Sequence, residues 1–256
     1  MGMLADTRHS RILARISEQG EASVRDLSEL LAVSPATIRR DLTLLGEAGR
    51  LQRVRGGARA GIGLQEPDER PFDEVAESSH ASKDRIARRA AELVADGDIV
   101  LLDIGTTTAL IARALRGRPV TIVTASVAVL DELRDDSEVE LVVLGGTLRR
   151  SYHSLVGPIT QLGLQHMRAT IAFVGTSGIA GDGTVLDTTV VEVPVKRAIV
   201  RSAGRVVLVA DETKFPGTGL LSACGPEDFH TLVTSEDSDA DTLATLSKLG
   251  IEVIQT

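Results

Sequence analysis

The chain has 256 residues, 43% hydrophobic and 25% charged, which is the composition of a globular protein with a sizeable buried core. Its single cysteine, Cys224, excludes a disulfide framework and a cysteine-based zinc site, and it fits a reducing cytoplasm. The sequence has no apolar run of about 18 residues and no secretory leader pattern, so neither a membrane span nor export is expected.

The net charge of −8 is unevenly distributed along the chain. Residues 1–60 contain ten arginines and seven acidic residues, a net charge of +3. The remaining residues contain 18 basic and 29 acidic groups, a net charge of −11. A basic head on an acidic body indicates a nucleic-acid-binding module joined to a module that binds no polyanion.

Three short helices are expected in the basic head. Ile12 and Ile16 lie four positions apart in the first helix, which Gly20 ends. Ser23 caps the second helix, with Asp26 three positions on. The apolar face of the second helix is expected to comprise Leu27, Leu30 and Leu31.

The third helix starts in the stretch "SPATIRRDL", where Ser34 is the cap and Pro35 takes the first helical position. At about 100° per residue, its core face and its outward face separate clearly. The core face is expected to comprise Ile38, Leu42 and Leu45. The outward face comprises Ala36, Thr37, Arg40 and Thr43, with Arg39 on its flank.

Small residues followed by a hydroxyl and an arginine suit a helix that enters the major groove of DNA. The following "RLQRVRGGAR" predicts a strand, a Gly-Gly turn and a return strand, with Arg50, Arg53 and Arg55 beside the phosphate backbone. A solvated helix followed by a hairpin is the alternative, but it explains neither the tandem capped helices nor the basic hairpin. The predicted DNA-binding residues are Ser34, Thr37, Arg39, Arg40, Arg53 and Arg55.

The run "SPATIRRDLTLLGEAGRLQRVRGGA" resembles the N-terminal winged helix-turn-helix of DeoR-family bacterial repressors. It follows that family's pattern of V-S-x-x-T-I-R-R-D-L, then L-x-x-x-G and a basic wing with two glycines. Arg55 stands where family members often have histidine, and it keeps the wing basic. The resemblance implies that residues 1–60 are a DNA-binding domain.

Residues 61–82 are expected to be an exposed linker, because they are acidic and contain Pro67 and Pro71. Beyond them, residues 83–256 alternate between helical patterns and continuously apolar strands such as "DIVLLD", "TIAFVG" and "RVVLVA". Such strands are typical of a sheet covered on both faces. The predicted fold class is therefore α/β: an N-terminal winged helix-turn-helix joined to a mainly parallel α/β domain.

In parallel α/β sheets, ligands bind at the C-terminal ends of the strands. Three loops expected there, "DIGTTT", "GTSGIAGDG" and "ADETKF", are rich in glycine and hydroxyls, which suits a phosphate. Lys214 could add a positive charge, whereas Asp103 would repel a phosphate and is assigned to sugar hydroxyls. Taken singly, a threonine-rich loop is more often an ordinary helix cap, and a lysine after a strand is usually a surface residue.

The sequence lacks the common motifs of nucleotide-binding, nucleophilic and metal sites. There is no G-x-G-x-x-G after a strand, no P-loop, no serine-nucleophile elbow and no metal cluster, and the five histidines are scattered. We therefore expect neither a cofactor nor a metal.

Residues 83 to about 235 resemble the sensor domain of the same DeoR family, which is similar in fold to ribose-5-phosphate isomerase. The matching motifs are D-x-G-T-T, the pair Gly145–Gly146, G-x-x-G-I (175–179) and A-D-x-x-K-F. Departures are Thr124–Ala125, where the family often has Thr-Asn, and Pro194, which predicts a helix start beyond Glu192. The effector residues that the resemblance implies are Asp103, Gly105, Thr106, Thr107, Thr108, Ser177, Gly178, Asp211 and Lys214.

The favoured interpretation is a cytoplasmic, non-enzymatic transcriptional repressor of sugar metabolism genes. It binds double-stranded operator DNA as a homo-oligomer, a dimer or tetramer, under the control of a phosphorylated sugar. The alternative from the enzyme class is a sugar-phosphate isomerase with a DNA-binding head, which needs a base such as Asp103, Asp211 or Glu192. Non-specific architectural DNA binding is a third hypothesis, which the acidic second domain disfavours.

Overall fold

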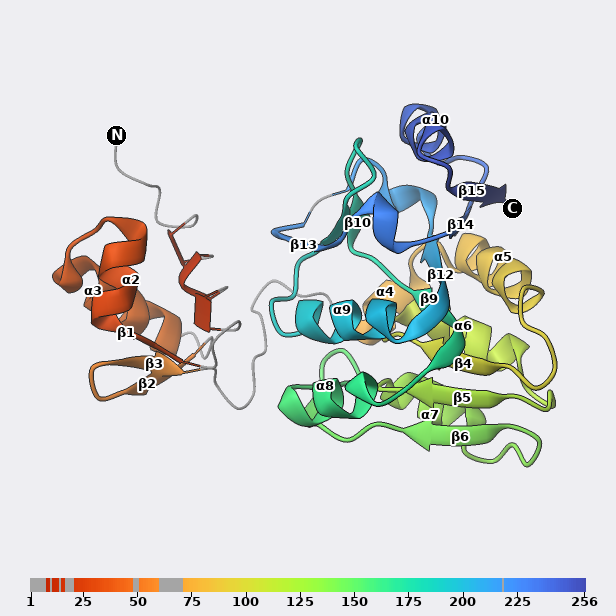
Figure 1. The fold of residues 1–256 in the computed structure, drawn as a ribbon, viewed down its shortest axis with the longest axis horizontal. Helices are drawn as coiled ribbons and strands as arrows, with labels where there is room; N and C mark the ends of the chain where they lie inside the picture. The colour runs from red at the N-terminus through yellow and green to blue at the C-terminus, as the bar shows by residue number, and fades with distance from the viewer. Residues whose placement is uncertain are drawn as a thin grey trace. The chain divides into compact units, whose positions relative to one another are not determined.

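The computed structural model describes residues 8, 9, 11–13, 15, 16, 21–47, 51–59, 71–217 and 219–256. The chain divides into two compact units, Met1–Glu69 and Arg70–Thr256 (Figure 1). The expected helix end at Gly20, the wing arginine Arg50 and the expected linker residues 61–70 lie outside the described residues.

The first unit contains two consecutive helices and a small sheet. α2 (Val24–Leu31) begins after Ser23, whose Oγ accepts a hydrogen bond from the Asp26 N–H at 3.1 Å, as the capping pattern predicts. α3 (Pro35–Glu47) follows after a three-residue turn. The strands β1 (Glu21–Ser23), β2 (Gln52–Val54) and β3 (Gly57–Arg59) form a sheet in the order β1-β3-β2.

The core of the first unit forms where the helical periodicity predicts it, with one exception. The predicted core residues of α3, Ile38, Leu42 and Leu45, are all buried, as are Ile12 and Ile16 in the preceding helical segment. The prediction for Leu30 was wrong, because its side chain is 54% exposed. The buried stripe of α2 is Val24, Leu27 and Leu31, and Leu30 lies about 90° from the centre of that stripe.

The two glycines of the wing have different physical roles. Gly56 lies in the turn between β2 and β3 with φ of 88°, a left-handed conformation that favours glycine. Gly57 pairs with Ser23 of β1, and a Cβ atom at Gly57 would lie 2.3 Å from the Ala22 carbonyl oxygen. The turn therefore falls at Arg55–Gly56, one residue earlier than the Gly-Gly pattern predicts.

The second unit is built on a seven-stranded sheet in the order β15-β14-β12-β9-β4-β5-β6. Every pairing in this sheet is parallel, as the sequence predicts. The strands are β4 (Ile99–Leu102), β5 (Thr121–Thr124), β6 (Glu140–Val143), β9 (Ala169–Val174), β12 (Ala203–Ala210), β14 (Thr231–Thr234) and β15 (Glu252–Gln255). All seven therefore end at one edge of the sheet.

Helices cover both faces of this sheet. One hydrophobic core joins alternate strand residues to α5 (His80–Ala91), α6 (Thr106–Ala114) and α7 (Val127–Leu133). A second core joins the opposite strand residues to α8 (Pro158–Gln165), α9 (Val193–Arg201) and α10 (Ala240–Lys248). In Figure 1, α8 and α9 lie in front of the sheet and α6 behind it. The two cores explain why these strands read as continuously apolar.

Several smaller elements occupy the crossovers. β7 (Thr147–Arg149) and β8 (Ser154–Val156) form a hairpin, and β10 (Gly178–Ile179), β11 (Val185–Asp187) and β13 (Leu221–Cys224) form an antiparallel sheet. Two short 3-10 helices, η1 (Glu212–Lys214) and η2 (Pro226–Asp228), complete the unit. α9 begins directly after Glu192, as Pro194 predicts.

The second unit begins earlier than the composition indicates. α4 (Phe72–Glu77) and the start of α5 fall inside the range 61–82 that the sequence predicts as linker. Phe72 is buried against residues far along the chain, and Lys83 in the first turns of α5 is also buried. The acidic residues of this segment lie on the exposed side of α4, and a six-residue helix is too short to show an apolar period.

Within the described part of the chain, no helix is long and apolar enough to cross a membrane. The same residues contain no group of three or more histidine, cysteine or acidic side chains that could hold a metal ion.

Candidate functional site

The outward side of α3 carries the residues predicted to contact DNA. The Thr37 N–H donates to Ser34 Oγ at 3.2 Å, and the hydroxyls of Ser34 and Thr37 are 2.9 Å apart. Ser34 and Thr37 thus fix the start of the helix. Arg39 and Arg40 follow in the next turn and are both exposed. The start of α3 therefore presents two hydroxyls and two guanidinium groups to solvent.

Arg53 of β2 lies against α3. Its Nη1 donates to Thr43 Oγ1 at 2.9 Å, and the Thr43 hydroxyl in turn donates to the Arg39 carbonyl oxygen at 2.8 Å. The side chain of Arg53 passes Gly46, where a Cβ atom would lie 3.3 Å from Arg53 Cγ. The structure therefore brings the side chain of Arg53 to Thr43 and, through Thr43, to the backbone of Arg39, whereas Arg55 lies exposed in the turn of the wing.

Asp41 ties the first helical segment to α3. It is 3% exposed and accepts hydrogen bonds from Arg8 Nε at 2.6 Å and Arg8 Nη2 at 2.9 Å, while His9 Nε2 lies 3.0 Å away. Burial raises the pKa of Asp41, but the hydrogen bonds and charges of Arg8 and His9 hold the pKa below its usual range.

We expect Asp41→Asn to lower the free energy of unfolding of the first unit by about 1.5–3 kcal/mol at neutral pH, because hydrogen bonds to a charged group are lost. A lowered carboxyl pKa stabilises the fold above the unfolded value of about 3.9, and this stability is lost as pH falls through the folded value. Scanning calorimetry of the full chain between about pH 3 and 7 measures both effects. An equal acid-side loss of stability in Asp41→Asn and wild type would contradict the assignment.

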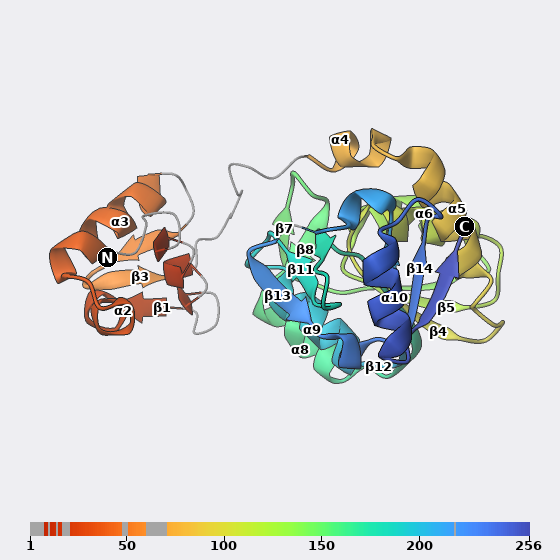
Figure 2. The same ribbon diagram turned by 90° about the horizontal axis from the view of Figure 1, so that it is seen from above.

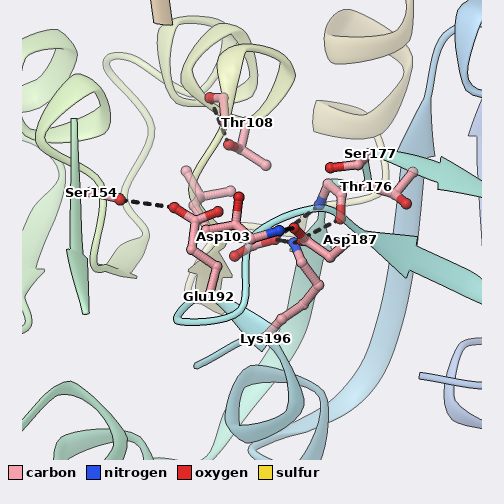
Figure 3. Close-up of polar contacts among 12 residues, drawn as sticks. Asp103, Thr108, Ser154, Thr176, Ser177, Asp187, Glu192 and Lys196 are labelled. Carbon is pink, nitrogen blue, oxygen red and sulfur yellow. Dashed lines mark hydrogen bonds and ion pairs between the residues drawn. The ribbon is translucent and has the colours of Figure 1, made fainter. Parts of the chain in front are cut away.

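The carboxyl ends of the central strands carry a buried charged cluster (Figure 3). Asp103 follows β4, and its Oδ2 pairs with Lys196 Nζ of α9 and accepts the Gly175 N–H at 3.1 Å. Lys196 Nζ also donates to the Gly175 carbonyl oxygen at 2.8 Å and lies 3.8 Å from Asp187 Oδ2. Three loops that are distant in sequence therefore meet at one ammonium group.

A second ion pair adjoins this cluster. Arg149 at the end of β7 pairs with Glu192, the residue before α9, and Ser154 Oγ donates to Glu192 Oε1 at 2.9 Å. Arg149, Asp187 and Glu192 are each 4% exposed, Lys196 is 2% exposed and Asp103 is 1% exposed. The site thus holds three carboxylates and two cations away from bulk water. Such burial persists only because every charge has a close partner.

The charges shift one another's ionisation. Burial alone would lower the pKa of Lys196, but Asp103, Asp187 and Glu192 raise it above its ordinary value, so the ammonium stays protonated. Burial raises the pKa of Asp187, an effect that Lys196 partly offsets. The cluster is therefore built around a protonated ammonium group that lies close to three buried carboxyl groups.

The residues predicted to hold a phosphate lie at the start of α6. Gly105 precedes the helix with φ of 139°, a conformation that favours glycine, and Thr106, Thr107 and Thr108 are buried. The Thr108 hydroxyl donates to the Gly105 carbonyl oxygen at 2.9 Å. In Figure 3, Thr108 lies on the same side of the site as Ser177 and Thr176. The helix N-terminus thus adjoins Asp103, the residue that follows β4.

The loop after β9 is held by its own hydrogen bonds. The Gly178 N–H donates to Thr176 Oγ1 at 3.0 Å, and the Ser177 N–H donates to the Leu186 carbonyl oxygen at 3.2 Å. Ser177 Oγ and Thr188 Oγ1 are 3.4 Å apart. The hydroxyl of Ser177 therefore lies against that of Thr188, and the N–H of Gly178 is used within the loop.

The loop after β12 carries the remaining predicted residues. Asp211 is buried, and its carboxylate accepts the Thr213 N–H at 3.0 Å and the Thr213 hydroxyl, which caps η1. Lys214 is half-buried at the end of η1. β12 and β4 are separated only by β9, so the two strands lie about 10 Å apart and end at the same edge of the sheet.

The sequence interpretation left out Arg149, Ser154, Asp187 and Lys196, and it named Glu192 only as a candidate base of the enzyme alternative. One signal was available, because Glu192 and Lys196 are spaced i, i+4 in the stretch "VEVPVKRAIV", where Arg197 is the only other charged residue. Arg149, Ser154 and Asp187 lie on short strands outside the main sheet, where no periodic pattern marks them.

Both units match families of known proteins. The family model described as "DeoR-like helix-turn-helix domain" matches residues 8–61, and the one described as "DeoR C terminal sensor domain" matches residues 78–236. The chain is similar to the "Glycerol-3-phosphate regulon repressor" of Haemophilus influenzae, with 32% identity over 91% of each chain. It is also similar to the "HTH-type transcriptional regulator GlpR" of Haloferax volcanii, with 32% identity over 98% of each chain.

Among solved structures, the chain is similar to ribose 5-phosphate isomerase A from Methanocaldococcus jannaschii. The identity is 21%, the match covers 54% of this chain and 55% of that chain, and the TM-score is 0.41. A likeness at this level supports no conclusion about activity.

Proposed function

The chain belongs to the DeoR family of transcriptional regulators, and from this membership we propose that it represses sugar metabolism genes under the control of a phosphorylated sugar. The observation that carries the proposal is the presence, on one chain, of a DNA-binding match over residues 8–61 and a sensor match over residues 78–236. The relatives bear the names of repressors and regulators, which favours this function over catalysis.

The first unit would place α3 in the major groove. The start of α3 carries Thr37 and Arg40 outward, and an arginine can form two hydrogen bonds to a guanine edge. Arg39, Arg53 and Arg55 would contact phosphates, and Ser34 would hold the helix start. Repeated half-sites would be read by a homo-oligomer, a dimer or tetramer, in the cytoplasm.

The second unit would bind the phosphorylated sugar at the charged edge of the sheet. The N–H groups at the start of α6 and the charge of Lys214 would hold the phosphate, which a helix N-terminus favours. Within the described residues, the side-chain hydrogen bonds of Asp103 are all made by Oδ2, so Oδ1 could accept a sugar hydroxyl. Asp211 and Ser177 would take further hydroxyls.

We propose that this site binds without catalysing an isomerisation. An isomerase needs a base that is poised to accept a proton from the substrate carbon. Here Asp103 is paired with Lys196, Glu192 is paired with Arg149, and Asp211 caps η1. Incubating the full chain with ribose 5-phosphate and assaying ribulose 5-phosphate tests this, and catalytic turnover would favour the enzyme instead.

The effector prediction concerns phosphate preference. Glycerol 3-phosphate, ribose 5-phosphate and fructose 6-phosphate form a test panel, each paired with its unphosphorylated parent. We expect at least one phosphate to bind the full chain more tightly than its parent by about 1.5–3 kcal/mol, the strength of a charge-assisted contact. Lys214→Ala should lose most of that preference in calorimetry, because it removes the cation that reaches the phosphate.

Lys248→Ala is the matched control, since Lys248 is an exposed lysine in the last turn of α10. If every phosphate bound no better than its parent, the site would not be a phosphate site. If the preference survived fully in Lys214→Ala, Lys214 would not belong to it.

A further inference from the structure

The first segment of the second unit lies between two loops of the charged site. This segment, residues 71–79, contains α4 and is called here the α4 strap. It follows residues 60–70, which connect it along the chain to the DNA-binding unit. In Figure 2, α4 runs along one border of the second unit towards α5. A change at the charged site could therefore reach the DNA-binding unit along the chain through the α4 strap.

The N-terminal end of the strap is anchored on the β7–β8 hairpin. The Phe72 N–H donates to the Ser151 carbonyl oxygen at 2.9 Å. The Phe72 ring stacks on His153 with centroids 5.1 Å apart and meets Tyr152 edge-on at 5.9 Å. Because the whole chain has only four phenylalanines and one tyrosine, this cluster uses two of its five phenyl rings at one contact.

The stem of the same hairpin forms one wall of the charged site. Arg149, at the end of β7, pairs with Glu192, and Ser154, at the start of β8, donates to Glu192. The guanidinium of Arg149 also lies 6.0 Å from the Tyr152 ring centroid. The residues that contact Phe72 lie in the turn of this hairpin, directly between Arg149 and Ser154, the two residues that contact Glu192.

The C-terminal end of the strap is anchored on the loop after β12. Ser79 Oγ donates to Glu212 Oε1 at 3.1 Å, and Glu212 Oε2 accepts from Ser235 Oγ at 2.7 Å. Glu212 directly follows Asp211, one of the proposed effector residues. The buried Lys83 fixes the bend between α4 and α5, with Nζ 2.5 Å from the Val75 carbonyl oxygen.

We infer that the α4 strap transmits occupancy of the charged site to the segment that joins the two units. A bound sugar that takes a contact of Arg149, Glu192 or Asp211 shifts the hairpin or the loop after β12, and each of these holds one end of the strap. A six-residue helix is not stable alone, so its position depends on those anchors. The inference rests on the proposed function, since it needs an effector whose affinity differs between two states.

The test uses the full chain, a DNA duplex selected by the wild-type chain from a random pool, and the member of the phosphate panel that binds most tightly. In wild type, the effector should change DNA affinity by about 5- to 150-fold, the usual range of allosteric coupling. In Phe72→Ala, the effector should still bind and DNA should still bind, but the ratio of DNA affinities with and without effector should fall towards one. Asp73→Ala, an exposed change on the same helix, should keep the wild-type ratio.

Ser79→Gly provides a second variant if Phe72→Ala does not fold. Ser79 has φ of 48°, which glycine adopts readily, so the substitution removes the hydroxyl without straining the backbone. It should reduce the ratio at least several-fold. Amide hydrogen exchange of residues 72–77 in the wild-type chain, with and without effector, needs no variant and should change on binding.

The outcomes separate the inference from the function on which it rests. If an effector alters DNA affinity equally in wild type, Phe72→Ala and Ser79→Gly, or leaves exchange in α4 unchanged, the strap is not the relay and the inference is overturned. If no panel compound binds the wild-type chain, the proposed function fails, and the inference fails with it.

Discussion

Lys196→Met is expected to lower the free energy of unfolding of the second unit by about 3–5 kcal/mol at neutral pH, the cost of breaking a buried ion pair by removing one partner. Methionine matches the length of lysine but leaves Asp103 and Asp187 facing each other with no cation between them. Calorimetric or chemical unfolding of the full chain measures the loss. The same variant should lose effector binding, because the carboxylates are no longer held in place.

Lowering the pH should narrow the difference between Lys196→Met and wild type. Burial already raises the pKa of Asp187, and losing the positive charge of Lys196 raises it further. A raised carboxyl pKa means that the folded state binds the proton more tightly, so the variant gains stability as pH falls through that value. The matched control is Lys214→Met, which should change stability by no more than about 0.5 kcal/mol. Equal losses in both lysine variants would contradict a structural role specific to Lys196.

Arg40→Ala is expected to weaken binding to a selected operator duplex by about 1–3 kcal/mol and to relax its sequence specificity. The reason is that Arg40 is exposed on the face of α3 opposite the buried Ile38, Leu42 and Leu45, where it can reach base edges. Binding to random duplex at the same salt concentration should change much less. Electrophoretic or fluorescence titrations with both duplexes measure the specificity ratio.

Arg53→Ala is the contrasting variant. It removes a wing arginine that contacts Thr43 of α3, and it should weaken binding to all duplexes and reduce the salt slope by about one unit. If Arg40→Ala weakened specific and random DNA by the same factor, Arg40 would be a phosphate contact and the proposed orientation of α3 would be wrong.

Elements with a strong local pattern could be predicted from the sequence. α3 has both a capping serine and a 3.6-residue apolar period, and the strands of the main sheet are apolar because both of their faces are covered. Leu30 was misassigned because the buried stripe of α2 includes Val24 as well as Leu27 and Leu31, which places Leu30 outside the edge of that stripe. The local sequence thus predicts where helices and strands lie better than it predicts which side chains on them are buried.

The contacts within the charged site could not be predicted in the same way. Asp103 and Lys196 meet across 93 positions of the chain, and Arg149 and Glu192 across 43. Such pairs depend on the strand order, which places β4 next to β9 and brings α9 under their ends. The burial of Phe72 could not be predicted for a related reason. Its partners lie on a hairpin about 80 positions further on, and the residues around it are acidic.

The central claim is that a phosphorylated sugar controls DNA binding by this chain. The most direct measurement titrates the full chain onto the selected duplex at fixed salt, with and without each member of the phosphate panel and its unphosphorylated parent. We predict that at least one phosphate changes the affinity by about fivefold or more while its parent does not. An affinity that stays the same with every phosphate, or that shifts equally with a phosphate and its parent, would contradict the claim.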